Sequence, residues 1–405
     1  MVSKLPQMKV VAARLVVLVI CLLAFANTNL TNLGNPASYQ RFAIPFYAEA
    51  VELTYDPGMM IDGPTELTNK SIRTTYNRLQ GRPTQVLLNH LLAAKGRYQL
   101  NDFLFYRLAS HTISALYRGE DLNAQRITLY KLLIDSGFDA RLTFRGDEVF
   151  VNVFTTQQLF EVPIIETNDR PYANLSCLEG ECEGHQRLYI FNDHPNPRGK
   201  SFDFQLRSWP ALTEQPTEKE LQFNYHGAAQ SLQVTFDKTM VDIMADYPFI
   251  HEYCYLETPL SPTLTGSLLP QLEAYLTGKT TQQQLELLAS FTRSAFAYKE
   301  DNEYFGRSKP MVPEELFGYS YSDCEDRSAL FFALVRDLLD LPMAVIAYED
   351  HLTVAVGTDA PGDSFHYKGQ RYLFCDPTGP RNSSRIGQIP PGYEDKSFTV
   401  IGTYN

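Results

Sequence analysis

The chain has fewer basic than acidic residues, no excess of glycine or proline, and a single long hydrophobic run. Among its 405 residues, 35 Lys and Arg stand against 47 Asp and Glu, which gives a formal net charge of -12. Nucleic-acid binding needs a basic surface that neutralises phosphates, so we expect no nucleic-acid partner. With only 23 Gly and 24 Pro, collagen-like and low-complexity chains are excluded as well. The length suffices for two or three domains of ordinary size.

The one long hydrophobic run lies near the N-terminus, at residues 15–26. Basic residues precede it, and it ends in the small-residue pattern Ala-Phe-Ala at which signal peptides are cleaved. We therefore predict a signal peptide at residues 1–26 and an exported protein, periplasmic or extracellular. The run is shorter than the roughly 20 residues that cross a bilayer. Its extension to residues 10–26 leaves an uncleaved membrane anchor as the alternative, and we expect no other contact with a membrane.

Cysteines are few, and cleavage of the signal peptide would leave an odd number of them: Cys177, Cys182, Cys254, Cys324 and Cys375. An odd number leaves at least one thiol unpaired, even in an oxidising compartment. Cys177 and Cys182 flank a short acidic loop, and we expect a local disulfide between them. Free thiols at both positions are the next alternative. A metal site with His185 ranks last, because only three ligands are visible where zinc normally takes four.

The spacing of apolar residues divides the mature chain into three regions. Residues 27–198 combine strand patterns with helical periodicity and predict a mixed α/β region. Residues 199–262 alternate with period two, as in Phe202–Leu206 and Leu221–Tyr225, which is typical of antiparallel strands. Residues 263–405 return to helical periodicity and end in apolar strand patterns. The sequence therefore predicts an α+β protein whose C-terminal domain packs a helix on an antiparallel sheet.

Residues 122–154 and 323–356 share one order of features. Each has an Arg, an apolar helix, a small break, an apolar strand, an acidic turn and a second apolar strand. When the two Arg are aligned, Asn123 falls on Cys324. This order suggests a duplication in which the N-terminal region is a degenerate copy of the C-terminal one. Helix-strand-strand is a common arrangement, however, so coincidence is the slightly preferred explanation.

The sequence around residue 324 combines a helix start with a cysteine. Ser322 followed by Glu325 is a capping-box pattern, which predicts that a helix begins here. Cys324 then lies in the first turn, where unpaired amides and the positive end of the helix dipole favour a thiolate. The residues that follow are apolar on nearly every face, which predicts a buried helix. Cys324 therefore has the position of a nucleophile, with a buried structural cysteine as the alternative.

Two further polar residues stand at the ends of predicted strands. His351 opens one strand, and Asp376 ends another. Together with Cys324 they would supply a thiol, an imidazole and a carboxylate, the set needed for acyl transfer through a thioester. His351 would accept the thiol proton, and Asp376 would orient the ring. Cys375 is no rival nucleophile, because neighbouring strand residues point to opposite faces.

The order of Cys324, His351 and Asp376, within the strings DCED and CDPT, resembles the transglutaminase-like superfamily of papain-type thiol enzymes. The closer similarity is to bacterial transglutaminase-like cysteine proteinases, and it covers about residues 265–395. It implies a papain-like fold, a Cys-His-Asp triad, a protein or peptide substrate and no cofactor. Some proteinases of this kind bind calcium near the nucleophile, at positions matched by Asp323 and Glu325. Capping of the helix explains Glu325 equally well.

The sequence departs from that family in two respects. Many members have an aromatic residue directly after the histidine, where this chain has Leu352. The only tryptophan, Trp209, is far from Cys324 in sequence, so the Trp that cross-linking transglutaminases use near the thiol is not evident. Tyr319 or Tyr321 would instead supply an oxyanion donor, together with the Cys324 amide.

One main hypothesis and two alternatives follow. We expect an exported thiol hydrolase or acyltransferase, in the first place a cysteine peptidase. In the first alternative the papain-like domain is inactive, and aromatic-rich strands at 201–260 form a binding or scaffolding surface. In the second, an amine instead of water attacks the thioester and cross-links Gln to Lys, which depends on how dry the pocket is.

Overall fold

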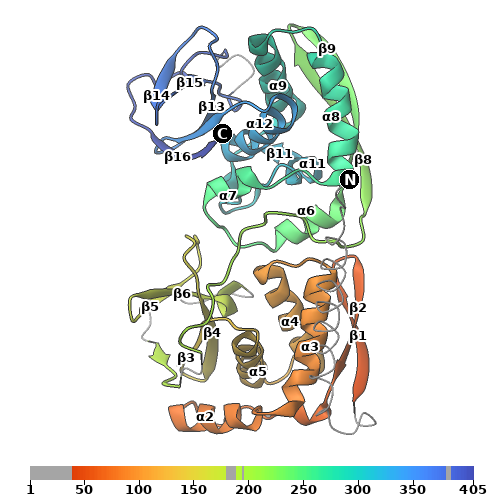
Figure 1. Ribbon diagram of the computed structural model, residues 1–405, viewed down its shortest axis with the longest axis vertical. Coiled ribbons are helices and arrows are strands. Elements are labelled where there is room, and N and C mark those ends of the chain that lie inside the picture. The colour runs from red at the N-terminus through yellow and green to blue at the C-terminus, as the bar shows by residue number, and fades with distance from the viewer. Residues whose placement is uncertain (1–38, 179–187, 194–195, 380–384) are drawn as a thin grey trace, which may run out of the picture.

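The computed structural model describes residues 39–178, 188–193, 196–379 and 385–405. The predicted signal peptide lies outside these ranges. Within them, none of the helices combines the length and the apolar character that crossing a membrane requires. The chain forms two bodies stacked along its long axis, which we call the N-terminal half (residues 40–190) and the C-terminal half (residues 216–404) (Figure 1).

The N-terminal half begins with an antiparallel hairpin, β1 (Gln40–Phe46) and β2 (Glu49–Tyr55). A 3-10 turn, η2 (Pro57–Met59), leads to four helices: α2 (Asn69–Arg78), α3 (Arg82–Arg97), α4 (Asp102–Leu116) and α5 (Leu122–Asp135). The remaining elements are β3 (Ala140–Arg145), β4 (Glu148–Phe154), β5 (Ile164–Thr167), β6 (Arg170–Asn174), η3 (Leu175–Leu178) and β7 (Tyr189–Ile190). The five strands β3 to β7 form one sheet in the order β5-β6-β4-β3-β7.

The C-terminal half opens with a second hairpin, β8 (Pro216–Tyr225) and β9 (Ala228–Asp237). Its main helices are α6 (Lys238–Ala245), α7 (Glu252–Glu257), α8 (Pro262–Leu276), α9 (Thr281–Ala295) and α12 (Cys324–Leu339). Between α9 and α12 lie β10 (Ala297–Tyr298), α10 (Asp301–Tyr304), α11 (Glu315–Gly318) and β11 (Tyr321–Ser322). The last sheet, in the order β14-β15-β13-β12-β16, comprises β12 (Met343–Ala347), β13 (Leu352–Val356), β14 (Ser364–Tyr367), β15 (Gln370–Phe374) and β16 (Thr399–Tyr404).

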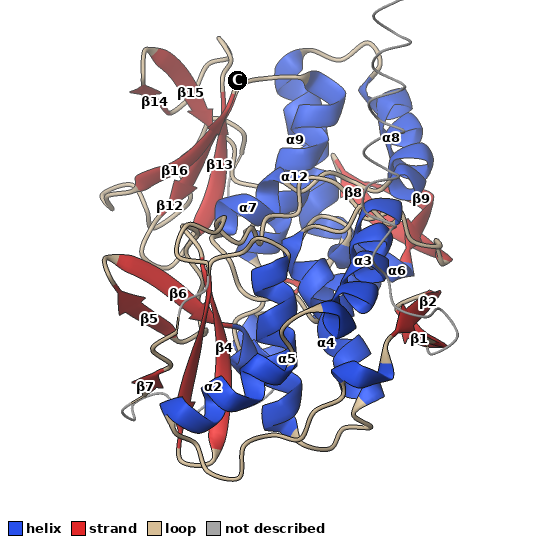
Figure 2. Cartoon of the chain, turned by 60° about the horizontal axis from the view of Figure 1, so that its bottom comes forward, coloured by secondary structure: helices blue, strands red, loops and turns tan. Residues whose placement is uncertain are grey.

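The two halves have the same topology. When β3 to β7 are matched in order with β12 to β16, the two strand orders become identical, and all neighbouring pairs are antiparallel. In each half a group of helices lies between the five-stranded sheet and the hairpin, α3 to α5 in the N-terminal half and α8, α9 and α12 in the C-terminal half (Figure 1 and Figure 2). β2 packs on α3 as β9 packs on α8, and α5 precedes its sheet as α12 does. The match in topology thus extends well beyond the one helix and two strands seen in the sequence.

The region predicted as antiparallel strands, residues 199–262, is divided between the two halves. The hairpin β8–β9 packs on α8 and α9 and belongs to the C-terminal half. Phe202–Leu206 forms no strand, although its side chains alternate between buried and half-buried. This segment runs extended along the core of the N-terminal half, which buries Phe202, Phe204 and Leu206. The alternation of apolar residues in this segment therefore reflects an extended backbone that belongs to no named strand.

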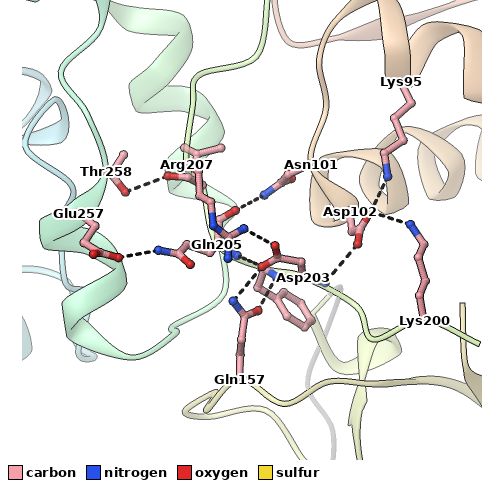
Figure 3. A network of polar contacts seen from close by, with 12 residues as sticks. Lys95, Asn101, Asp102, Gln157, Lys200, Asp203, Gln205, Arg207, Glu257 and Thr258 are labelled. Carbon is pink, nitrogen blue, oxygen red and sulfur yellow. Dashed lines mark hydrogen bonds and ion pairs between the residues drawn. The ribbon is translucent and has the colours of Figure 1, made fainter. Parts of the chain in front are cut away.

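A polar network holds this connecting segment in place (Figure 3). Asp102, at the start of α4, accepts a hydrogen bond from the backbone N–H of Asp203 (3.2 Å). Gln157 donates to the Asp203 carboxylate from the N-terminal half (2.8 Å). Gln205 donates to Glu257 at the end of α7 in the C-terminal half (2.8 Å). Both halves therefore form hydrogen bonds with the same connecting segment, which is not a flexible linker.

Candidate active site

Helix α12 begins at the predicted nucleophile, with Cys324 as its first residue and Asp323 as its N-cap. The backbone N–H of Asp323 donates to Asp326 Oδ2 (3.0 Å), so Asp323 and Asp326 form the capping box. The box predicted from Ser322 and Glu325 is therefore wrong by one position. The two patterns overlap in the string SDCED, and Asp is as good an N-cap as Ser.

The Cys324 thiol is 9% exposed and lies between two groups of opposite effect. The backbone at Leu352 acts to lower the pKa of the Cys324 thiol, whereas Glu325 accepts a hydrogen bond from the thiol, with 2.7 Å between Sγ and Oε2, and acts to raise it. Burial raises the pKa of the Cys324 thiol well above its usual range, and the charges of Glu325 and Asp323 raise it further. The helix dipole therefore does not produce a thiolate here, because burial and the adjacent carboxylates outweigh it.

His351 and Asp376 meet at the edge of the sheet that faces α12. His351 directly precedes β13, and Asp376 follows the paired strand β15. His351 Nε2 lies 3.4 Å from Asp376 Oδ1, which leaves Nδ1 as the ring nitrogen for the thiol. Burial raises the pKa of Asp376, but the hydrogen bond and charge of His351 and the Thr378 hydroxyl outweigh it and lower the pKa to about 2. Asp376 is therefore ionised at neutral pH.

Two threonines that the sequence analysis missed hold the Asp376 carboxylate. Thr353 Oγ1 and Thr378 Oγ1 both donate to Asp376 Oδ1, at 3.1 and 2.6 Å. Thr378 Oγ1 also lies 3.3 Å from His351 Nε2. Arg293 of α9 donates to the backbone carbonyl of Asp376. Thr378 stands in the CDPT string, but nothing in the sequence indicates that strand β13 supplies a second hydroxyl to the same oxygen.

The structure brings His351 to Asp376, and it packs α12, which Cys324 opens, against β13, which His351 directly precedes. Leu352, the first residue of β13, follows His351 in the chain. Ser328 Oγ of α12 donates to the Leu352 carbonyl (3.1 Å), which fastens the helix to the first residue of β13. The thiol at the start of α12 and the imidazole directly before β13 therefore lie on elements that pack against each other, and the Asp376 carboxylate contacts Nε2 of the ring.

Aromatic rings surround the imidazole. The His351 ring centroid lies 5.0 Å from that of Tyr393 and 6.3 Å from that of Tyr348. Tyr348 and Tyr393 also contact each other (4.7 Å). The aromatic residue that many members of the suspected family place after the histidine is Leu352 here, but these two tyrosines supply aromatic contact from elsewhere in the chain.

The tyrosines proposed as oxyanion donors belong to an aromatic cluster beside the helix start. The Tyr319 ring packs edge-on against Phe305 (5.3 Å), and the Tyr321 ring packs against Tyr304 (5.0 Å). These contacts fix both rings without showing where their hydroxyl groups would meet a substrate. The oxyanion role of Tyr319 or Tyr321 stays a prediction.

Buried carboxylates gather next to the nucleophile. Oxygens of Asp301, Asp323 and Asp326 lie within 4.8 Å of one another, and so do the ligand atoms of Asp323, Cys324 and Glu325. Burial and mutual repulsion raise the pKa of Asp323 and Asp326, and burial raises that of Asp301 to about 6. Asp323 Oδ1 is buried and has no hydrogen-bond partner in the described part of the chain. Carboxylate oxygens with this unrelieved repulsion suit Ca²⁺.

The sequence analysis named Asp323 and Glu325 as calcium candidates and missed the other two carboxylates. We expect Ca²⁺ to raise the melting temperature by several degrees relative to a chelator, because binding to the folded state alone contributes about 2.7 kcal/mol at a hundredfold excess over Kd. Asp323→Asn should remove most of this shift in calorimetry. Mg²⁺ serves as the control ion, since it accepts such sites less readily. If the melting temperature did not depend on Ca²⁺, the cluster would not bind the ion, and its carboxyl groups would instead share protons.

The remaining cysteines behave differently from Cys324. Cys375 is fully buried in the core of the C-terminal half, whereas Asp376 contacts His351. Cys254 is half-buried, and burial raises its pKa to about 11. Cys177 lies in η3, whereas Cys182 lies outside the described residues, so the disulfide between them stays a prediction.

The corresponding positions of the N-terminal half hold no thiol or imidazole. Asn152 faces Asn174 in the sheet as Ala355 faces Phe374. By this register, Glu148 corresponds to His351 and Ser176 to Asp376. Asn123, which aligns with Cys324, accepts through Oδ1 from the backbone N–H of Val149 (2.9 Å), the residue that corresponds to Leu352.

The three side chains in these positions are engaged in structural hydrogen bonds. Arg126 donates to Glu148 (2.7 Å), and Ser176 Oγ accepts from the Val151 N–H (2.9 Å). Among the described residues, the positions that correspond to Cys324, His351 and Asp376 in the N-terminal half therefore carry an amide, a carboxylate and a hydroxyl instead. Comparison of the chain with protein-family models, with curated proteins and with solved structures finds no match in any of them.

Proposed function

We propose that the protein is a thiol-dependent hydrolase or acyltransferase, in the first place a cysteine peptidase of the transglutaminase-like, papain-type kind. One observation carries this proposal. His351 Nε2 faces the Asp376 carboxylate at 3.4 Å, and the next residue, Leu352, accepts a hydrogen bond through its carbonyl from Ser328 of α12, the helix that Cys324 opens (3.1 Å). These contacts support a triad in which the Cys324 thiol, the His351 imidazole and the Asp376 carboxylate act together, as thioester chemistry needs.

The reaction begins with a proton transfer from the Cys324 thiol to His351 Nδ1. The thiolate then attacks the acyl carbon of an amide, and the S–C bond forms. The imidazolium returns its proton to the leaving amine as the C–N bond breaks, which leaves a thioester. Water, deprotonated by His351, attacks the thioester as the C–S bond breaks; the carboxylic acid leaves, and the imidazolium returns its proton to the Cys324 sulfur. Asp376 stabilises the imidazolium and holds the ring in the tautomer that presents Nδ1.

Substrate and setting follow as further parts of the proposal. The substrate is a protein or peptide. The predicted signal peptide at residues 1–26 is the basis for export to the periplasm or the outside of the cell. An amine in place of water would turn the same thioester into a cross-link. An inactive binding protein is the second candidate, which the raised pKa of the Cys324 thiol and its bond to Glu325 favour.

Alkylation by iodoacetamide at neutral pH tests the nucleophile. We expect Cys324 to react faster than Cys254, and His351→Ala to slow the reaction of Cys324 at least tenfold, about 1.4 kcal/mol in the barrier. Rates are resolved by peptide mass mapping of the full chain, and Cys254→Ser provides the matched background. Equal rates at Cys324 with and without His351 would overturn the proposed function and favour the inactive binding protein.

A further inference from the structure

One segment of the C-terminal half has no counterpart in the N-terminal half. Helix α4 ends at Leu116 and α5 begins at Leu122, whereas α9 ends at Ala295 and α12 begins at Cys324. Residues 296–323, which we call the insertion, contain β10, α10, α11 and β11. The insertion is thus found in the half that has the triad, and it runs directly into the nucleophile.

The insertion carries a row of aromatic rings. The Tyr304 centroid lies 4.6 Å from that of Phe305 and 5.0 Å from that of Tyr321, and Phe305 lies 5.3 Å from Tyr319. Tyr298 and Tyr304 are 45% and 37% exposed, whereas most large apolar side chains in the described part of the chain are buried. We call these five residues the aromatic rim. Neighbouring aromatic rings that are partly exposed in this way offer a surface on which another molecule could pack.

The aromatic rim borders the triad. Tyr298 faces Ser322 in the parallel pairing of β10 and β11, and Cys324 follows two residues later. The guanidinium carbon of Arg327 lies over the Tyr298 ring, 5.0 Å from the ring centroid. Arg327 in turn donates to the backbone carbonyl of Thr378 (2.7 Å), the residue that contacts the imidazole and the carboxylate.

Positive charges of the chain itself already lie against the rim. Lys299 Nζ is 5.8 Å from the Tyr304 centroid and 5.4 Å from that of Tyr321. The Arg327 guanidinium likewise lies against the Tyr298 ring. The chain's own cations already lie against these ring faces, and Glu300 accepts from the Tyr298 hydroxyl, so the exposed ring surfaces that remain suit an uncharged ring or a large apolar group.

We propose that the aromatic rim recognises the acyl donor, and that this donor is a peptide with an aromatic or large apolar side chain beside the carbonyl that Cys324 attacks. The inference rests on the proposed function, because it needs Cys324 as the nucleophile. It adds a substrate class and a specificity surface, with Tyr298 and Tyr304 as its exposed members.

Two alkylating reagents test the rim with probes of known structure. Iodoacetamide and its N-phenyl form, iodoacetanilide, undergo the same step, in which the S–C bond forms as the C–I bond breaks and iodide leaves. We take the ratio of their second-order rate constants at Cys324 and divide it by the same ratio for free glutathione. We expect a preference for the phenyl reagent of about three- to tenfold, the range of a single aromatic pair, and its loss in Tyr298→Ala and Tyr304→Ala.

Matched variants separate the rings from other effects. Tyr298→Phe keeps the ring and loses only the bond of its hydroxyl to Glu300, so it should restore the wild-type preference. Tyr189→Ala removes a ring that is 55% exposed on β7 of the N-terminal half, and it should change nothing. A wild-type preference near one, or one that both rim variants retain, would overturn the inference. Failure of iodoacetamide itself to label Cys324 would overturn the proposed function, and the inference with it.

Discussion

Replacing Arg327 by Met will lower the free energy of unfolding by about 3–5 kcal/mol. Arg327 is 1% exposed, and its guanidinium donates to the carbonyls of Phe296 and Thr378 (both 2.7 Å) and to Ser322 Oγ (3.2 Å). Methionine fills a similar volume but donates no hydrogen bond. The substitution therefore leaves three acceptors buried without a partner in the segments that Arg327 joins.

Chemical unfolding of the wild type, Arg327→Met and Arg327→Lys measures this loss. Lysine keeps the charge but cannot reach three acceptors in the planar geometry of a guanidinium, so we expect roughly half of the loss. Arg327→Met should also weaken the dependence of Cys324 alkylation on His351, because Thr378 loses its tie to α12. A loss below about 1 kcal/mol would mean that water or other donors satisfy these carbonyls equally well.

Local patterns were enough to place the three reacting groups. Cys324 follows a good N-cap and opens an apolar helix, and His351 and Asp376 stand at the ends of apolar strands. Each of these features is written within a few consecutive residues. The sequence therefore predicted where each group lies along its element, and the alternation of strand residues correctly turned Cys375 toward the core.

The features that the sequence did not reveal depend on contacts between distant segments. Asp301 reaches Asp323 and Asp326 only because the insertion folds back beneath the start of α12. Thr353 and Thr378 share one oxygen of Asp376 because two strands pair in a particular register. No local spacing encodes either event, so the carboxylate cluster was seen in part and the threonines were missed.

The helix N-terminus shows why position alone does not set a pKa. The dipole favours a thiolate by typically 0.3–1 kcal/mol at an exposed helix end. At Cys324 the loss of water and the adjacent carboxylates act in the opposite direction and prevail. The reactivity expected of Cys324 therefore depends on His351 as the proton acceptor, which is the reason for the large effect we expect from His351→Ala.

The insertion that carries the aromatic rim is itself held by a buried ion pair. Lys309 is 8% exposed and Glu315 is fully buried, and the Lys309 ammonium contacts Glu315 Oε1. Glu315 Oε2 also accepts from the Val312 N–H (3.0 Å). Lys309→Met should cost about 3–5 kcal/mol of unfolding free energy at neutral pH, because it leaves a buried carboxylate without its counter-charge.

The double variant Lys309→Met with Glu315→Gln isolates this cause. Glutamine removes the uncompensated charge and keeps an acceptor for the Val312 amide, so the double variant should recover about 2 kcal/mol or more of the single loss. The Lys309 ammonium lies 5.6 Å from the Phe305 ring centroid and 5.0 Å from that of Tyr319. If the double variant recovered no stability, the loss in Lys309→Met would come from the packing of the lysine side chain against these rings.

The pH dependence of the single variant gives a second, independent measure. Burial raises the pKa of Glu315, and Lys309 opposes this by favouring the charged form. Without Lys309, the pKa of Glu315 in the folded state rises further above its value of about 4.3 in the unfolded chain. The folded state then binds the extra proton, so the deficit in stability is small near pH 4 and grows as the pH rises. Because a packing defect has no such pH dependence, unfolding of Lys309→Met at pH 4 and pH 7 distinguishes charge from shape.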